Sequence, residues 1–284
     1  MTAPVIVGCD DSVLMGHGPH NPKEDAQMTD ATSQHASPTS TPLTTAIAVL
    51  LDETGSMESC RDAAIEGFNA WLTEQKRTPG TAGAPPTPTT LTLVKFSDRP
   101  DLPMCRLVCE GAPLGAVRPL DRETYTPEGG TPLLDAVGRT IMWMDRLQPK
   151  PARVLVVILT DGEENASREF KPAQIQDLIR AHEATGCWTF AYLGANQDAW
   201  AVGETLGIAP GNRASFKVGE THQAFQRVSK ATKRFRLSGD ASGAAFWEAG
   251  DQAPAPGPAE GFAPRPAPEA TPRSPRGPSA NPAA

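Results

Sequence analysis

The sequence predicts an α/β fold with an open, mostly parallel central sheet and helices on both of its faces. Two observations support this prediction. Short, continuously apolar runs recur along the chain, and such runs are typical of strands that are covered on both sides. Segments with apolar residues at helical spacing separate these runs. Because strand–helix–strand units connect parallel strands, the alternation indicates a parallel α/β sheet.

Four segments are predicted to be strands. The runs at 44–51 (TTAIAVLL) and 154–159 (VLVVIL) are apolar throughout, which favours central positions in the sheet. The runs at 91–96 (LTLVKF) and 188–193 (WTFAYL) are shorter and rich in β-branched and aromatic residues. A fifth segment, 105–109, is ambiguous, and we interpret it as an edge strand.

Four amphipathic helices are predicted between and after these strands. They are marked by Ala64, Ile65, Phe68 and Leu72; by Leu134, Val137, Ile141 and Met144; by Ile175, Leu178, Ile179 and His182; and more weakly by Phe225, Val228 and Phe235. His182 lies on an otherwise apolar face. We therefore expect it to be a hydrogen-bonded structural residue and not a ligand.

Composition divides the chain into one folded domain with polar flanks. The chain has 284 residues and 29 prolines, and the prolines and polar residues gather near both ends. Segments of this kind bury too little apolar surface to offset the entropy lost on ordering. We expect disordered segments at 1–41 and 241–284, and a folded domain at 42–240. Within that domain, a mobile Pro/Thr-rich loop is expected at about 77–90.

The overall charge and the cysteines restrict the class of protein. The net charge is −7, which does not suggest a nucleic-acid partner. No stretch approaches the roughly 18 apolar residues of a membrane span, and the amino terminus has no secretory core. The five cysteines form no CxxC pair and leave one over. We therefore expect a reduced, cytoplasmic protein that binds neither nucleic acid nor membrane.

Oxygen-bearing side chains follow the predicted strands where ligands bind in such sheets. Asp52, Thr54 and Ser56 come directly after the first strand, and Asp161 follows the strand at 154–159. Thr131 precedes a predicted helix. Two carboxylates and three hydroxyls are hard donors that suit Mg²⁺, with Mn²⁺ or Ca²⁺ as alternatives, better than zinc. The sequence therefore predicts a metal site built from these five residues.

The donor set leaves such an ion incompletely satisfied. Two aspartates neutralise a divalent cation and three hydroxyls add no charge, so a carboxylate from outside would find an open coordination position. Glu53, Gly130 and Glu163 lie in the same three loops and are predicted to form the rim that contacts a partner. Asn196 follows the last clear strand at the same edge, where it can line this rim or begin a helix.

These residues resemble the metal-ion-dependent adhesion site of von Willebrand factor A (vWA) domains. The motifs that carry the resemblance are Asp52-x-Thr54-x-Ser56, Thr131 after two glycines, and Asp161-Gly162. The flanking phrases TPEGGTPLLDAV and VILTDGEEN are similar to those of bacterial intracellular members of the family. One departure is visible: Thr54 stands where the family usually has serine, and its additional methyl group restricts χ1.

The resemblance covers residues 43–240 and implies a Rossmann-like vWA fold with a bound Mg²⁺. It also implies that Asp52, Thr54, Ser56 and Thr131 lie near the metal. The aspartate that corresponds to Asp161 often contacts the metal through a water molecule in this family. A partner carboxylate would complete the coordination. The resemblance further implies an AAA+ ATPase or a stress-response assembly as partner.

Each site residue has a simpler explanation that stays open at this point. Ser56 can cap the helix that follows it, Thr131 before Pro132 is a good helix start, and Asp161-Gly162 can be a turn. A vWA fold that serves as a scaffold without metal is a further alternative. All five ligand positions hold competent donors, which favours the metal site.

The predicted function is therefore a Mg²⁺-dependent protein-interaction module that binds an acidic side chain, and not an enzyme. The alternative is a Mg²⁺-dependent hydrolase or phosphatase that uses Asp52. Haloacid-dehalogenase phosphatases need a second acidic residue two positions after the nucleophile, where this chain has Thr54. The chain also lacks a P-loop and a GxGxxG motif, and only His182 and His222 fall in the predicted domain.

Overall fold

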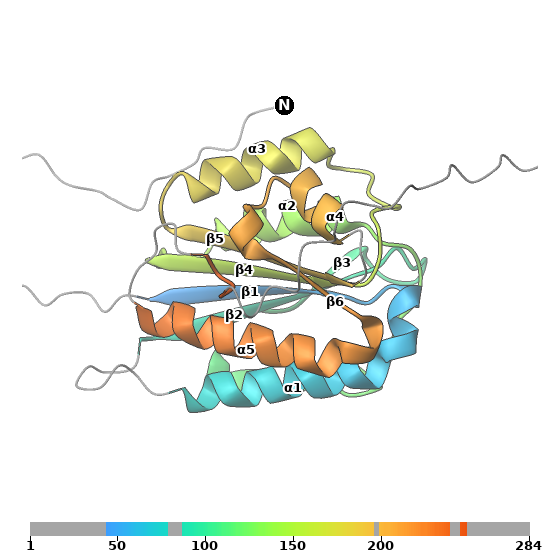
Figure 1. Cartoon of the computed structure of the whole chain (residues 1–284), viewed down its shortest axis with the longest axis horizontal. Helices are drawn as coiled ribbons and strands as arrows, with labels where there is room; N and C mark the ends of the chain where they lie inside the picture. Colours follow the sequence, from blue (N-terminus) through green and yellow to red (C-terminus); the bar gives the residue numbers. More distant parts are fainter. Residues whose placement is uncertain (1–43, 79–86, 196–198, 239–244, 249–284) are drawn as a thin grey trace, which may run out of the picture.

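One six-stranded sheet forms the centre of the computed structural model, which describes residues 44–78, 87–195, 199–238 and 245–248 (Figure 1). The strands are β1 (Thr45–Asp52), β2 (Thr89–Phe96), β3 (Cys105–Pro113), β4 (Arg153–Thr160), β5 (Trp188–Ala195) and β6 (Arg213–Phe216). Their order across the sheet is β3-β2-β1-β4-β5-β6. All neighbours are parallel except β2 and β3, which are antiparallel.

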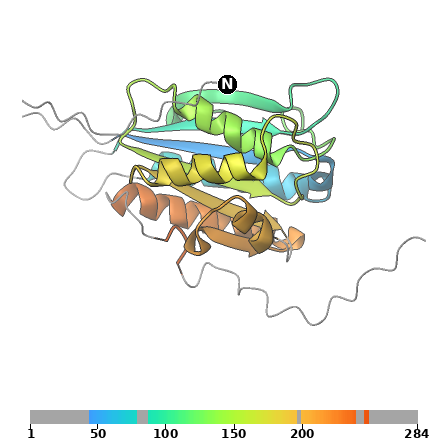
Figure 2. The ribbon, with the colours of Figure 1, turned by 90° about the horizontal axis from the view of Figure 1, so that it is seen from above.

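Helices cover both faces of this sheet (Figures 1 and 2). They are α1 (Arg61–Arg77), α2 (Leu133–Met144), α3 (Pro172–Glu183), α4 (Ala199–Thr205) and α5 (Thr221–Ser238). α1 and α5 lie on one face, and α2, α3 and α4 lie on the other. The predicted fold class, a Rossmann-like α/β fold with a mostly parallel sheet, is confirmed. None of the helices in the described part of the chain is long and apolar enough to cross a bilayer.

β1 shows why the central runs are apolar throughout. Ala46, Ala48 and Leu50 pack into the cluster formed with α2 and α3, whereas the alternate residues Ile47 and Val49 pack into the cluster formed with α1 and α5. Side chains on a strand point alternately to the two faces, so a strand covered on both sides needs an apolar residue at every position.

The structure adds elements that the sequence patterns did not predict. β6 has only four residues and α4 only seven, so neither is long enough to show a period. Segment 105–109 is indeed part of an edge strand. His182 is structural, as expected: its Nδ1 lies 2.7 Å from the Leu178 carbonyl and its Nε2 lies 3.2 Å from the Asp145 carboxylate.

The predicted domain end at residue 240 is too early. Phe246 and Trp247 are buried against the main core. The Phe246 amide donates to Asn212 Oδ1 at 2.8 Å, and the Trp247 amide donates to the Gly211 carbonyl at 3.3 Å. The folded part therefore includes 245–248. The other predicted flexible segments, 1–41, most of 77–90 and 249–284, lie outside the described residues.

Candidate metal centre

The strand order places the ends of β1 and β4 side by side at the middle of the sheet. From β1 the chain moves to β2 on one side and later returns to β4 on the other side. Such a reversal opens a crevice at the carboxyl ends of the two strands, which is where α/β sheets bind ligands. Asp52 ends β1, and Asp161 follows directly after β4. The two predicted carboxylates thus meet at this switch point.

Asp52 is completely buried, and both of its carboxylate oxygens accept hydrogen bonds. The Thr54 amide donates to Oδ1 at 2.8 Å. The Thr160 hydroxyl donates to Oδ2 at 2.5 Å. These contacts fix the orientation of the carboxylate. Sequence reasoning missed Thr160, although its position as the last residue of β4, beside β1, could have indicated it.

A chain of hydroxyls connects the two aspartates. Thr54 Oγ1 and Ser56 Oγ lie 3.1 Å apart, and Ser56 Oγ donates to Asp161 Oδ1 at 2.6 Å. Neither hydroxyl caps a helix, because the turn 55–60, which contains Ser56, and the following helix α1 both lack a side-chain cap bond. The alternative of a simple capping role for Ser56 is therefore not what the structure shows.

Gly162 completes the arrangement by leaving room for other oxygens. A Cβ added to Gly162 would lie 2.7 Å from Thr131 Oγ1, 3.5 Å from Ser56 Oγ and 3.7 Å from Asp52 Oδ2. Thr131 thus approaches the same point as the residues from β1 and β4. Its hydroxyl does not cap α2, which has Pro132 at the N-cap position and no side-chain cap bond. Thr131, Ser56 and Asp52 thus surround Gly162, and Thr54 and Asp161 join this cluster through their contacts with Ser56, so the structure brings all five predicted ligand residues together.

Backbone hydrogen bonds hold two of the site loops against each other. The Gly55 amide donates to the Gly129 carbonyl, and the Glu128 amide donates to the Glu53 carbonyl, both at 3.0 Å. Gly129 has φ +84°, and a Cβ there would lie 2.8 Å from the Arg99 amide nitrogen. Only glycine fits this position without strain. The loop that carries Thr131 is therefore anchored independently of the site side chains.

The loop after β4 is fastened to the start of α2 by its own side chains. Asn165 Oδ1 accepts the Thr131 amide at 2.8 Å, and Glu164 Oε2 accepts the Leu134 amide at 2.9 Å. Glu164 therefore occupies a helix N-terminus, where a negative charge is favourable. These contacts couple the position of Thr131 to that of Asp161. Sequence reasoning did not identify either residue, because their partners lie about thirty positions away in the chain.

Glu53 is a correction to the predicted rim. Its side chain is completely buried, and Oε1 accepts from Lys95 Nζ at 3.1 Å and from the Thr126 amide at 2.6 Å. Arg106 contacts the same carboxylate. Two cations from β2 and β3 thus hold Glu53 inside, where it cannot contact a partner.

The remaining rim predictions have different outcomes. Gly130 is half-buried, and a Cβ on it would lie 2.8 Å from Asn165 Oδ1. Glu163 is exposed at the surface beside Asp161. Asn196 lies outside the described residues. Contact of Gly130 and Glu163 with a partner stays a prediction.

The electrostatics of the site leave negative charge without compensation. Burial raises the pKa of the Asp52 carboxyl to about 6, although hydrogen bonds from Thr160 and Thr54 partly oppose this. Burial also raises the pKa of Asp161. In the part of the chain that the structure describes, neither carboxylate forms an ion pair with a cationic side chain. A buried, unpaired carboxylate is costly. The donor set therefore fits a divalent cation, which would supply the missing positive charge.

Hydroxyl groups are essential to this fit. Among the described residues, no group of three or more His, Cys, Asp and Glu side chains is arranged to hold a metal ion. Two carboxylates alone make a weak site, so an ion here depends on the oxygens of Thr54, Ser56 and Thr131. Oxygen-only coordination of this kind suits hard cations.

No protein-family model and no curated protein sequence matches the chain. Among solved structures, the chain is similar to proximal thread matrix protein 1 from the mussel byssus, with 15% identity over 66% of this chain and 46% of that chain and a TM-score of 0.45. It is also similar to the vWF domain of the type V pili tip protein Mfa5 from Porphyromonas gingivalis, with 9% identity over 70% of this chain and 98% of that chain and a TM-score of 0.47. A third similar structure is the manganese-loaded TRAP protein of Plasmodium vivax, with 15% identity over 64% of this chain and 72% of that chain and a TM-score of 0.41.

The chain spans about half the length of the mussel protein that it matches. Likeness at this level of identity and TM-score carries no conclusion about function.

Proposed function

We propose that the chain is a metal-dependent protein-interaction module that holds Mg²⁺ and binds an acidic side chain of a partner protein. One observation carries this proposal. Two carboxylates without a cationic partner, one of them fully buried, meet three hydroxyl groups around Gly162 at the switch point of the sheet. This arrangement has five oxygen donors and enough negative charge to neutralise a divalent cation, and it leaves a coordination position for a ligand from outside.

The residues have distinct roles in this proposal. Asp52, Thr54, Ser56, Thr131 and Asp161 would hold the ion. Bound there, the ion would supply the positive charge that attracts a carboxylate from outside. Thr160 holds Asp52 in orientation, and Gly162 leaves the space that the ion needs. The exposed Glu163 and the half-buried Gly130 lie beside this space and would contact the partner.

The chemistry of the donors favours Mg²⁺, with Mn²⁺ or Ca²⁺ as alternatives. A cytoplasmic location and an AAA+ ATPase or stress-response assembly as partner are also part of the proposal. The location rests on the free thiols of Cys60, Cys105 and Cys109, whereas Cys187 is disulfide-bonded, which the expectation of a fully reduced protein did not foresee. The partner class rests on the motifs that resemble bacterial intracellular vWA domains.

Calorimetric titration of Mg²⁺ into the chelator-treated protein tests the metal site. We expect one binding event in the native chain and none in Asp52→Ala. Asp177→Ala serves as a matched control, because Asp177 is an exposed carboxylate on α3 that pairs with Arg180 and belongs to none of the site loops. Equal heats from all three proteins would contradict the proposal.

Partner recognition is tested with a display library of peptides that each carry one Asp or Glu. The same peptides with Asn or Gln are the control. Capture should need both Mg²⁺ and the carboxylate. The competing hydrolase is tested by a phosphatase and phosphodiesterase screen with Mg²⁺, in which turnover that Asp52→Asn abolishes would overturn the interaction module.

A further inference from the structure

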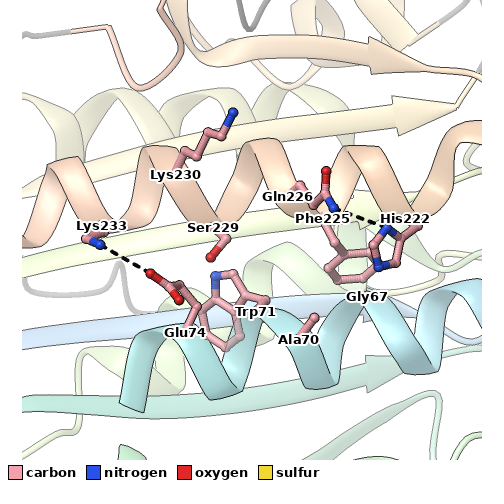
Figure 3. Close-up of a pocket in the computed structure, with 10 residues that line it drawn as sticks. All are labelled: Gly67, Ala70, Trp71, Glu74, His222, Phe225, Gln226, Ser229, Lys230 and Lys233. Carbon is pink, nitrogen blue, oxygen red and sulfur yellow. Dashed lines mark hydrogen bonds and ion pairs between the residues drawn. The ribbon is translucent and has the colours of Figure 1, made fainter. Parts of the chain in front are cut away.

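A groove runs between α1 and α5 on the outer surface of the molecule (Figure 3). Its volume is about 350 Å³. Ala70 and Trp71 from α1 and Phe225 from α5 line its apolar part. The two helices approach closely beside the groove. A Cβ added to Gly67 would lie only 2.3 Å from the Phe225 ring, so glycine at this position allows the approach. The groove is on the sheet face opposite α2 and α3 and shares no lining residue with the candidate metal centre.

The polar residues of the groove offer donors and one unpaired positive charge. At one end, Glu74 is already paired with Lys233 at 3.2 Å. His222, Gln226 and Lys230 are spaced four residues apart along α5, which puts about 6 Å between successive side chains on one side of the helix. Lys230 is exposed and forms no ion pair with any residue that the structure describes. In Figure 3 it extends from α5 away from α1, along the upper border of the groove.

Residue 248, the last one that the structure describes, lies next to the row formed by His222, Gln226 and Lys230. Arg234, four residues after Lys230, lies 3.1 Å from Glu248 Oε1, and its Nη2 donates to the Phe246 carbonyl at 3.0 Å. Residue 248 is therefore held against α5 one helical turn from Lys230. The segment that begins at residue 249 therefore starts close to the end of the row formed by His222, Gln226 and Lys230.

The composition of that segment complements the groove. Residues 249–263 include three prolines, one phenylalanine (Phe262) and two acidic residues (Asp251 and Glu260), and they contain no lysine or arginine. Proline-rich chains favour the polyproline II conformation, whose backbone carbonyls have no internal partner. Apolar, aromatic-lined grooves with hydrogen-bond donors bind such segments.

The segment after residue 248 is also long enough to reach the groove and to fill it. The twelve residues from His222 to Lys233 span about 17 Å of helix, and about six residues of polyproline II at ~3.1 Å each cover that distance. Fourteen residues separate 248 from 262 in the sequence. The segment can therefore cross from Arg234 to the groove and still fill it. Attachment to the same chain gives an effective concentration in the millimolar range, so weak contacts suffice.

We propose that residues 257–262 of this chain bind in the groove between α1 and α5, with Glu260 paired to Lys230 and Phe262 on the apolar surface at Ala70. The occupant is the acidic end of a proline-rich segment, in extended conformation. Binding in this groove is independent of the metal site.

A photo-crosslinking residue, p-benzoylphenylalanine, placed at position 262 of the full chain tests this proposal. Mass spectrometry should find the cross-link on α1 or α5 within a monomer, at the same yield with Mg²⁺ and with chelator. Cross-links to other elements, or only between two chains, would overturn the proposal.

Variants of the groove make the test specific. Ala70→Glu should lower the cross-link yield at least tenfold, because it fills the groove and repels Glu260. Thr73→Glu is the matched control on an exposed part of α1 outside the lining, and it should leave the yield unchanged. Equal yields in these two variants would overturn the assignment to this groove.

A charge exchange provides a second measurement that does not depend on groove shape. Lys230→Glu should lower the yield about fivefold, and adding Glu260→Lys to it should restore the yield. Lack of restoration would contradict the Lys230–Glu260 pair. Thermal melting of each variant reports whether the fold is retained, since all the substituted helix positions are exposed.

Discussion

Asp52 and Glu53 are neighbours in the sequence, and both side chains are completely buried, yet their surroundings are opposite. Glu53 is enclosed by the cations of Lys95 and Arg106. Asp52 receives only neutral donors, from the Thr54 amide and the Thr160 hydroxyl. The charge of Glu53 is therefore balanced by the protein itself, whereas the charge of Asp52 is not. The comparison separates a carboxylate that supports the fold from one that is available to an ion.

The largest expected effect tests the Glu53 half of this comparison. Glu53→Gln leaves Lys95 and Arg106 without their partner in a buried position, and breaking such a cluster costs about 3–5 kcal/mol of unfolding free energy. Asp52→Asn removes a charge that no cation balances, so it should not destabilise the metal-free protein. Urea unfolding in the presence of chelator measures both. A loss for Asp52→Asn that equals the loss for Glu53→Gln would remove the distinction.

The pH dependence of stability should differ between native protein and Asp52→Asn. The pKa of Asp52 is raised from 3.8 to about 6 in the folded protein. The folded state then binds more protons than the unfolded state between these values, so stability falls as pH rises. A carboxyl pKa that rises from 3.8 to about 6 on folding corresponds to about 3 kcal/mol.

We therefore expect the native protein to lose about 3 kcal/mol relative to Asp52→Asn between pH 4 and pH 7, with chelator present. Chemical unfolding at each pH measures the difference between the two proteins. A difference that stays constant, or that grows in favour of the native protein at neutral pH, would contradict the raised pKa.

Magnesium should reverse that loss at neutral pH. A ligand that binds only the folded state at one hundred times its Kd stabilises it by about 2.7 kcal/mol. We expect an increase of this order in the native protein and no increase in Asp52→Asn. Thermal melting with and without Mg²⁺ measures it, with Asp177→Asn as the control that should respond like the native protein.

The smallest expected effect concerns space and not charge. Gly162→Ala keeps all five ligand residues but places a methyl group 2.7 Å from Thr131 Oγ1. We expect about tenfold weaker Mg²⁺ binding, equivalent to about 1.4 kcal/mol, measured by calorimetric titration. Unchanged affinity would show that the ion does not occupy the space beside Gly162.

The same comparison shows what sequence reasoning could and could not provide. The apolar runs of β1 and β4 predicted the central strands, and those strands in turn located Asp52 and Asp161 at one edge. Glu53 was wrongly predicted to be part of the partner-binding rim, because the residues that enclose it, Lys95 and Arg106, come from β2 and β3. Their pairing with Glu53 depends on strand register, which the local sequence does not contain.

Short elements and long-range contacts were missed for related reasons. β6 is too short to show a period, and Phe246 and Trp247 are surrounded by small and polar residues that resemble a flexible segment. Their burial depends on contacts with Asn212 and Gly211, thirty or more positions earlier. Packing of this kind is a property of the assembled fold and not of the local composition.

The order of the strands also has a consequence for the time at which the protein can take up an ion during its synthesis. Ser56 and Asp161 are 105 positions apart, and their side chains meet only when β4 has paired with β1. A nascent chain that ends before β4 has four of the five proposed donors but lacks Asp161 and the strand that places it beside β1. An ion at the proposed site would therefore find its complete donor set only after β4 has paired with β1, and β5 and β6 would still be added to the sheet after that step.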